Sequence, residues 1–314
     1  YHSVMSLFYI FLGFFLLVIG GEFIIRASVS ISLKFKLPKF IIGMTVMAFA
    51  TSLPELIVSI SAAYKGSPSI ALNNIIGSNI ANIGLVLSVI SISTLIVIEK
   101  SFYKKDWPIM FIFTIMLFVF TLDLIISQLD GLVMFFCLLV FIYYFISKKQ
   151  HKNLDNEVNE KLVKSSGFKI ILWLFISALS LFYGAEFLVD GAVDFAKKMN
   201  VSEAVISVSI VAIGTSIPEL AASLIAIIKK EKGLSVGNII GSNIFNIGLV
   251  LGITSLLKPI QVDSEILYRD IPWVIAFSVL ILILALLPKK NSIGKAKGFL
   301  MLLAYIYFIL YTFS

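Results

Sequence analysis

Charged residues are scarce in this sequence. Only 14% of the 314 residues are Asp, Glu, Lys or Arg, whereas a soluble globular domain has about 25%. Hydrophobic residues account for 59% of the chain. This composition argues strongly against a soluble enzyme and favours a protein embedded in a membrane.

Cysteine is nearly absent as well. The single Cys137 lies in the apolar run FFCLLVF, so the chain can form no internal disulfide and no cysteine-ligated metal cluster. The two histidines, His2 and His151, lie outside the long apolar runs. We expect no cofactor, no enzymatic activity and no obligatory protein partner.

Long apolar runs fill most of the chain. A helix needs about 20 apolar residues to cross the hydrocarbon core of a bilayer, and we identify ten candidates. They are residues 6–32, 38–64, 69–97, 107–126, 129–147, 168–196, 202–228, 233–257, 268–287 and 297–313. The polar segment 148–167 is the only substantial break and is expected to be a solvated linker.

The basic residues indicate the orientation in the membrane. With ten spans, 19 Lys residues fall in loops on one face, whereas only five Lys or Arg residues fall on the other. Basic loops remain in the cytoplasm. We therefore expect both termini to be extracellular and the linker 148–167 to be cytoplasmic, in a multi-pass protein of the cell membrane. The net charge of +7 then reflects topology rather than nucleic-acid binding.

The sequence contains an internal repeat. Residues 21–87 align without a gap to residues 185–251. Within this alignment, NIIGSNIANIGLVL (74–87) and NIIGSNIFNIGLVL (238–251) agree at 13 of 14 positions, and TSLPEL (51–56) matches TSIPEL (215–220). A duplication retained only for helix packing is the alternative, but packing does not require a repeated glutamate inside a membrane.

Five predicted spans precede the linker and five follow it, so the second half enters the membrane upside down relative to the first. We therefore predict an all-α membrane protein of two inverted five-helix repeats, an architecture of many secondary transporters. The halves are residues 1–147, with the first motif region at 38–97, and residues 168–314, with the second at 202–257.

Glu55 and Glu219 occupy equivalent positions inside apolar spans. An ionisable side chain at membrane depth costs several kcal/mol and usually faces a partner or a wet cavity. Neither motif contains Lys or Arg, so the natural partner is a cation, and oxygen ligands favour sodium, calcium or magnesium. One calcium ion, two monovalent ions or two protons would balance the two carboxylates.

A proline precedes each glutamate. Pro54 and Pro218 lack an N–H group and clash with the carbonyl four residues earlier, so we expect helix breaks around 50–54 and 214–218. Broken helices are tolerated at membrane depth where they line a cavity. A plain proline kink, with neighbouring Ser and Thr bonded back to the backbone, is the alternative.

The second motif places Ser78 and Asn82 four residues apart, and Ser242 and Asn246 likewise. Residues i and i+4 share one helix face, so these side chains can line one wall of a cavity. Close helix packing through small residues is the competing explanation. Glu22 is expected to pair with Arg26 rather than to bind an ion.

These two duplicated motifs resemble the alpha repeats of the cation/calcium antiporter superfamily, and within it the sodium/calcium exchanger branch of the compact prokaryotic type. The resemblance implies that calcium is bound by Glu55, Glu219, Thr51 and Thr215. It implies that the sodium sites share both glutamates and include Ala48, Ser52, Ser78, Asn82, Ala212, Ser216, Ser242 and Asn246. It also implies that the first and sixth spans slide past a rigid core.

The expected function is therefore antiport of sodium and calcium by alternating access, with about three sodium ions per calcium ion. Proton/calcium exchange through the same two glutamates is the alternative, although Thr51 and Thr215 stand where that branch usually has asparagine. Potassium dependence is disfavoured because potassium-dependent relatives carry aspartate at the position of Asn246. Ala50 and Asn73 depart from Gly214 and Gly237 of the second repeat.

Overall fold

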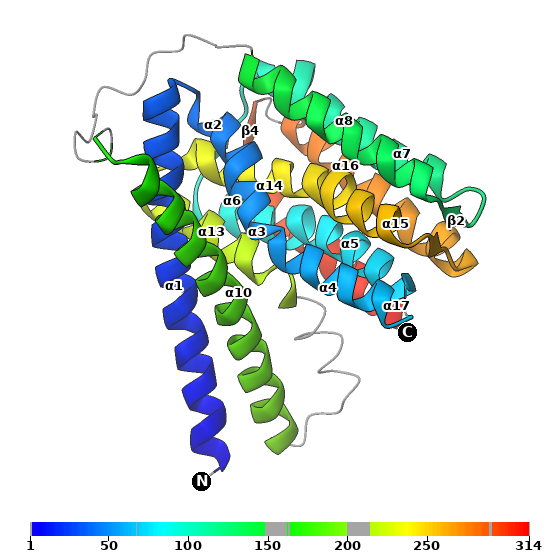
Figure 1. Ribbon diagram of the computed structural model, residues 1–314, viewed down its shortest axis with the longest axis horizontal. Coiled ribbons are helices and arrows are strands. Elements are labelled where there is room, and N and C mark those ends of the chain that lie inside the picture. Colours follow the sequence, from blue (N-terminus) through cyan, green and yellow to red (C-terminus); the bar gives the residue numbers. More distant parts are fainter. Residues whose placement is uncertain are drawn as a thin grey trace. The chain divides into compact units, whose positions relative to one another are not determined.

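The computed structural model describes residues 2–66, 68–147, 162, 164–199, 214–288 and 291–313 (Figure 1). These residues form helices joined by short turns and two small sheets, which confirms the all-α prediction. Helix formation follows from the bilayer, since a helix satisfies all backbone hydrogen bonds within one segment where no water is present.

The elements of the first half are α1 (His2–Phe35), α2 (Lys39–Ile42), the π-helical turn η1 (Gly43–Met47), α3 (Ala48–Thr51), α4 (Leu53–Tyr64), α5 (Pro68–Ala81), η2 (Asn82–Leu87), α6 (Ser88–Ser93), β1 (Ile96–Val97), η3 (Phe102–Asp106), α7 (Trp107–Phe120), β2 (Ile125–Ile126) and α8 (Gln128–Ser147).

The elements of the second half are α10 (Gly167–Lys198), α13 (Ile217–Ile228), α14 (Lys232–Phe245), η5 (Asn246–Leu251), α15 (Gly252–Leu257), β3 (Ile260–Gln261), η6 (Ile266–Asp270), α16 (Ile271–Leu286), β4 (Ser292–Ile293) and α17 (Lys295–Phe313).

The described residues contain seven helical segments long and apolar enough to span a membrane, or eight if the bent pair 39–51 and 53–64 counts as one span. The predicted number of ten is therefore not confirmed as such. The predicted span 107–126 is shorter in the structure, because α7 ends at Phe120 and is followed by a turn and β2. Most of the linker 148–167 and the first part of the predicted span 202–228 lie outside the described residues.

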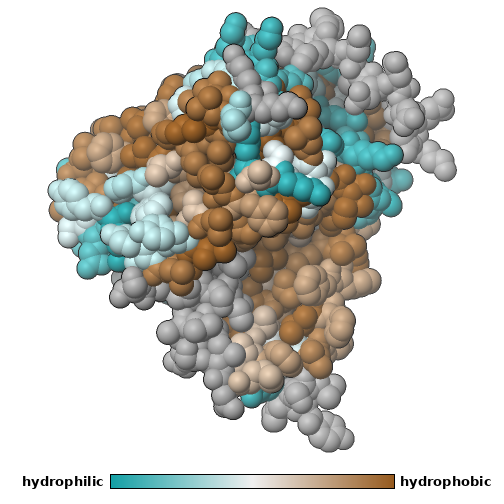
Figure 2. Space-filling view, turned by 180° about the vertical axis from the view of Figure 1, so that it is seen from behind, coloured by the Kyte–Doolittle hydropathy of each residue, from teal (hydrophilic) through white to brown (hydrophobic). Residues whose placement is uncertain are grey.

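Large apolar side chains cover much of the surface. Phe11 of α1 is 71% exposed, Phe168 of α10 is 78% exposed and Leu303 of α17 is 66% exposed. Figure 2 shows broad hydrophobic areas, with hydrophilic residues gathered in separate patches. A soluble monomer rarely exposes apolar patches of this extent, so these helix faces contact lipid.

The chain divides into two compact units that cut across the sequence repeat. The first contains residues 1–53 and 148–238, and the second contains residues 54–147 and 239–312. Each unit therefore draws helices from both sequence halves. The two halves are related by sequence similarity, whereas the two units are defined by which helices pack together.

In the first unit, α1 packs lengthwise against its own repeat equivalent, α10 (Figure 1). Contacts pair Ile10 with Gly191, Leu17 with Gly184 and Gly20 with Leu181. Residues later in α1 contact residues earlier in α10, so the two helices run antiparallel. Equivalent helices in opposite directions are what an inverted repeat requires, and this pair confirms that prediction.

The second unit also pairs elements from the two sequence halves. Strand β1 pairs with β4 and β2 pairs with β3, both antiparallel, so each sheet joins one strand from each half. Gly84 abuts Phe277 and Tyr305, and its equivalent Gly248 abuts Phe113 and Leu138. Because Phe113 and Phe277 are also equivalent, the unit has an internal approximate two-fold axis.

Candidate ion-binding site

Both proline motifs break their helices as predicted. Between α3 and α4 the chain bends by 41°, with Ser52 at φ −87° and ψ 3°. Ser216, immediately before α13, has nearly the same angles, φ −92° and ψ 2°. These values lie in the sparsely populated region between helix and strand, and the repeat preserves them in both copies.

The Ala48 carbonyl oxygen remains hydrogen-bonded at the break. It accepts a hydrogen bond from the backbone N–H of Ser52 at 3.0 Å and another from the Thr51 hydroxyl at 3.3 Å. A cation approaching this oxygen therefore competes with two donors. Ala212, the equivalent position in the second repeat, lies outside the described residues.

Each glutamate lies in the first turn of the helix that follows a break. Glu55 is the third residue of α4, Glu219 is the third residue of α13, and both side chains are fully buried. The N-terminus of a helix carries a partial positive charge that favours an anionic side chain. This partial charge offsets only part of the cost of a carboxylate at membrane depth, which leaves both groups suited to a cation.

An asparagine ties α4 to α5 in the second unit. Asn74 donates from Nδ2 to the Ser59 hydroxyl at 3.2 Å and to the backbone carbonyl of Glu55 at 3.4 Å. Ser59 lies one turn after Glu55. Asn74 therefore fixes the helix that carries the glutamate against the helix that carries the Gly-Ser-Asn motif.

The first unit repeats this tie between α13 and α14. Asn238, equivalent to Asn74, donates to the hydroxyl of Ser223 at 3.1 Å. Its Oδ1 also accepts a hydrogen bond from the Thr51 hydroxyl at 3.2 Å. Neither asparagine was among the predicted site residues, although their duplication together with Ser59 and Ser223 was a signal for them.

A chain of asparagines crosses the interface between α5 and α14 in the second unit. Asn246 donates from Nδ2 to Asn79 Oδ1 at 3.0 Å, and Asn79 donates to the backbone carbonyl of Asn243 at 3.3 Å. Asn82 and Asn246 each begin a π-helical turn, η2 and η5. Single π-helical turns within α-helices occur frequently at functional sites.

Several predicted sodium ligands present buried oxygens without a hydrogen-bond partner among the described residues. They are the hydroxyls of Ser52 and Ser216, the side-chain amide of Asn82 and Oδ1 of Asn246. A buried polar atom left without a partner costs about 1–3 kcal/mol. Such oxygens, together with two buried carboxylates, form a donor set suited to hard cations.

The remaining predicted ligands are distributed between the units. Ser78 and Ser242 are buried in the second unit, Thr51 is buried in the first, and Thr215 of the first unit is half-buried. The described ranges contain no cluster of three or more His, Cys, Asp or Glu side chains. Asn73 is exposed, so it contributes no buried ligand.

Glu22 forms the predicted local ion pair. Its Oε1 lies 2.9 Å from Nε of Arg26, and its Oε2 lies 2.7 Å from Nζ of Lys229. The second contact, between α1 and the end of α13, was not predicted, because it joins residues far apart in sequence. Both carboxylate oxygens of Glu22 are therefore paired with cationic side chains.

An all-helical membrane protein with an inverted repeat and two buried carboxylates at broken helices belongs, by its architecture, with the secondary transporters. Comparison with known proteins narrows this class. The sequence profile of the family described as sodium/calcium exchanger protein matches residues 5–147 and 169–314.

The similar proteins cover nearly the whole chain. A putative antiporter, CaxA of Alkalimonas amylolytica, is 31% identical over 98% of each chain. The sodium/calcium exchanger MaX1 of Methanosarcina acetivorans is 29% identical and covers 96% of this chain and 97% of its own. The solved structure of the sodium-calcium exchanger NCX_Mj superposes with a TM-score of 0.82 at 32% identity over 99% of each chain. The chain belongs to the sodium/calcium exchanger family.

Proposed function

We propose that this chain exchanges sodium for calcium across a cell membrane by alternating access. The observation that carries the proposal is the duplicated, fully buried glutamate, Glu55 and Glu219, each in the first turn after a helix break. Membership of the exchanger family supports the same conclusion.

In this proposal the two carboxylates converge on one calcium ion, with Thr51 and Thr215 as neutral ligands. Two carboxylates balance the charge of one calcium ion. At 4 Å and an effective dielectric constant near 20, each carboxylate attracts the divalent ion by about 8 kcal/mol. Neither carboxylate alone neutralises the calcium ion, so we expect both to be required.

The sodium sites share the glutamates, so sodium and calcium compete for occupancy. The additional sodium ligands are Ala48, Ser52, Ser78, Asn82, Ala212, Ser216, Ser242 and Asn246. Three sodium ions against one calcium ion move one net charge per cycle. The orphaned oxygens of Ser52, Asn82, Ser216 and Asn246 support this assignment, because each is buried and has no competing donor among the described residues.

Alternating access would involve α1 and α10, the long antiparallel pair of the first unit. Their contacts run through glycines at Gly13, Gly20, Gly184 and Gly191. Small residues at a helix interface let backbones approach closely. We place both termini outside the cell and the lysine-rich loops inside.

Proton/calcium exchange is the second candidate. Two carboxylates buried away from water can be neutralised by protons as well as by sodium. The neutral amide at Asn246 argues against potassium dependence, since it lacks the charge that would help to hold a further monovalent ion.

Calcium uptake into proteoliposomes tests the proposal, with sodium, potassium and proton gradients imposed one at a time. We expect calcium uptake into sodium-loaded vesicles, with no requirement for potassium. Because exchange of three sodium ions for one calcium ion makes the vesicle interior negative, an ionophore that dissipates this potential should make uptake faster. Uptake that follows the proton gradient and ignores sodium would assign the chain to proton/calcium exchange. Uptake with no counter-ion would indicate a channel.

A further inference from the structure

A hollow of about 520 Å³ lies beside the C-terminal end of α16, in the second unit. Its lining combines polar and apolar residues: Lys100, Lys104, Tyr103, Asn291, Leu282 and Leu286. None of them belongs to the proposed ion site. A smaller hollow of about 380 Å³, beside Lys65, has a single cation in its lining.

The helical spacing gives the hollow two chemically distinct walls. Lys100 and Lys104 are four residues apart, with Lys104 in η3 and Lys100 two residues before it, and Leu282 and Leu286 are four residues apart on α16. Residues at this spacing share a helix face. One wall therefore presents two ammonium groups, and the other presents two aliphatic side chains.

Hydrogen bonds at the end of α16 hold these walls together. Tyr103 donates its hydroxyl to the Ala285 carbonyl at 2.9 Å, and the backbone N–H of Asn291 donates to the same oxygen at 2.9 Å. Lys297 Nζ donates to the Leu284 carbonyl at 2.5 Å. These donors satisfy carbonyls at the negative end of the helix, which reduces the repulsion that an anion would meet there.

Both lysines of the hollow are available to a ligand. Lys100 and Lys104 are exposed, and neither forms an ion pair with a residue in the described ranges. The acidic neighbours are Glu99, adjacent in sequence, and Asp106, whose side chain is buried. Lys105 adds a third cation beside the pair, so the surroundings of the hollow are basic.

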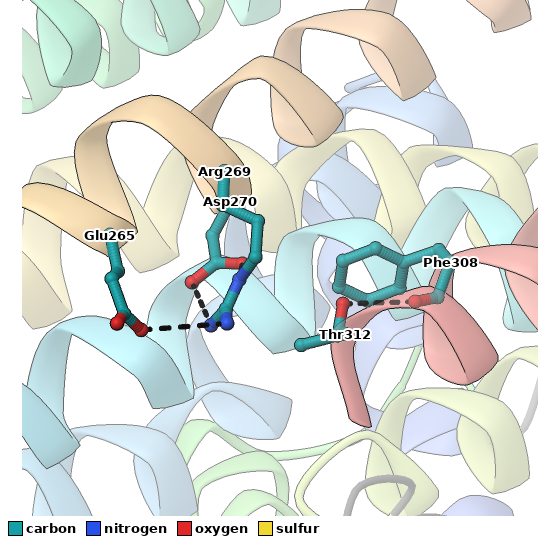
Figure 3. A network of polar contacts seen from close by, with 5 residues as sticks. All are labelled: Glu265, Arg269, Asp270, Phe308 and Thr312. Carbon is teal, nitrogen blue, oxygen red and sulfur yellow. Dashed lines mark hydrogen bonds and ion pairs between the residues drawn. The ribbon is translucent and has the colours of Figure 1, made fainter. Parts of the chain in front are cut away.

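The repeat supplies an internal comparison. In the second half, Ser264 and Tyr268 stand at the positions of Lys100 and Lys104, and Arg269 stands at that of Lys105. Figure 3 shows Arg269 directed at Asp270 and Glu265, with its nitrogens 2.8 Å and 3.6 Å from the carboxylates. The fold thus does not require cations here, and only one copy of this segment carries available lysines.

We propose that this hollow binds an anionic phospholipid of the membrane, with its phosphate against Lys100 and Lys104 and an acyl chain against Leu282 and Leu286. Charge complementarity selects an anionic headgroup, because basic pockets at the lysine-rich face of membrane proteins attract such lipids. The aliphatic wall selects a lipid over a free phosphate ion, which has no apolar part.

Native mass spectrometry of the full chain tests the proposal. The purified protein is titrated with phosphatidylglycerol or phosphatidylcholine, and bound lipid is measured for wild type and for variants. We expect one phosphatidylglycerol to bind in preference to phosphatidylcholine. Lys100→Gln with Lys104→Gln should weaken this binding about 30-fold, from the typical contribution of two lysines near a membrane surface. Lys100→Arg with Lys104→Arg should retain it.

The control is Lys34→Gln with Lys36→Gln, which removes the same charge from two other exposed lysines of the same predicted face. An equal loss of lipid binding in the control would show that the effect comes from general surface charge, and it would overturn the proposal. Equal binding of phosphatidylcholine, or displacement of the lipid by an equal concentration of inorganic phosphate, would also overturn it. Thermal unfolding in phosphatidylcholine verifies that each variant is folded.

Discussion

Asn79 donates a hydrogen bond to the backbone carbonyl of Asn243, the residue that occupies its own position in the second repeat. Thr114 and Ser278, another equivalent pair, also lie within hydrogen-bond distance, at 3.3 Å. A residue can touch its own equivalent only near a two-fold axis. The axis of the second unit therefore passes close to the asparagines of the repeated Gly-Ser-Asn motifs.

Replacement of Asn246 by aspartate should make transport depend on pH. Asn246 donates to Asn79 Oδ1, and a carboxylate at this position would instead place two acceptors together unless it binds a proton or a cation. We expect a pH profile or ion selectivity that differs from wild type, measured as calcium uptake between pH 6 and pH 9. An unchanged profile would show that residue 246 is not at the ion pathway.

Asn238→Ala should lower both stability and transport. Asn238 bonds Ser223 and Thr51, and its removal takes one hydrogen bond from each of these buried hydroxyls, at a cost of about 0.5–1.5 kcal/mol per bond. Asn74→Ala should have a smaller effect because Asn74 is only half-buried. Thermal unfolding and uptake kinetics measure this, with Asn73→Ala at an exposed position as the control. Equal effects at all three positions would contradict the account.

Gly13→Ala should disturb the pairing of α1 with α10. A Cβ at this position would lie 2.6 Å from the backbone nitrogen of Leu188, and backbone cannot move aside as a side chain does. We expect a loss of about 1–3 kcal/mol, visible as a lower unfolding temperature. Gly77→Ala is the control, because nothing lies within 4 Å of its added Cβ. A wild-type unfolding temperature for Gly13→Ala would refute this packing.

The buried carboxyl of Asp106 is expected to make the free energy of unfolding depend on pH. It lies one residue before the predicted span 107–126. Burial raises the pKa of its carboxyl from 3.8 to about 6, opposed by a hydrogen bond from Ser101 and by the charge of Lys105. A raised pKa means that the folded state binds more protons than the unfolded state. Stability therefore falls as pH rises from about 4 to about 6 and stays lower above that range.

Asp106→Asn should remove this fall and stabilise the protein at pH 7 by at most about 3 kcal/mol. Its repeat equivalent serves as the control, because Asp270 pairs with Arg269 and Asp270→Asn should be destabilising. Thermal unfolding at pH 4.5 and pH 7 distinguishes the two substitutions. Destabilisation of both variants at pH 7 would contradict the origin assigned to the effect.

Glu55→Gln or Glu219→Gln should each abolish calcium transport. The amide keeps the shape of the side chain but removes one of the two charges that balance calcium, so ion binding loses several kcal/mol in a site of low dielectric constant. Uptake by proteoliposomes measures this, with Asn73→Ala as the folded, active control. Uptake at the wild-type rate in either glutamine variant would refute the assignment.

The sequence predicted features that follow from local chemistry. Pro54 and Pro218 located both helix breaks, because a residue without an N–H group cannot continue the backbone ladder. The duplicated motifs predicted the inverted architecture, and the apolar runs located most spans. The Glu22–Arg26 pair was also predictable, since residues four apart on a helix face each other.

Other features depend on contacts between distant segments. Lys229 reaches Glu22, and Asn238 reaches Thr51, across about 200 residues of chain. The π-helical turns at Asn82 and Asn246 leave no mark in residue spacing that differs from an α-helix. The end of α7 at Phe120 was missed because the apolar residues that follow it enter β2 and pair with β3.

The central claim, that one carboxylate from each repeat holds a single calcium ion, is tested most directly by equilibrium binding of radioactive calcium to the purified protein. We predict one calcium ion per wild-type chain, displaced by sodium, and no binding at the same concentration in Glu55→Gln or in Glu219→Gln. Two calcium ions per wild-type chain, with one retained in each single variant, would show two independent sites and contradict the account.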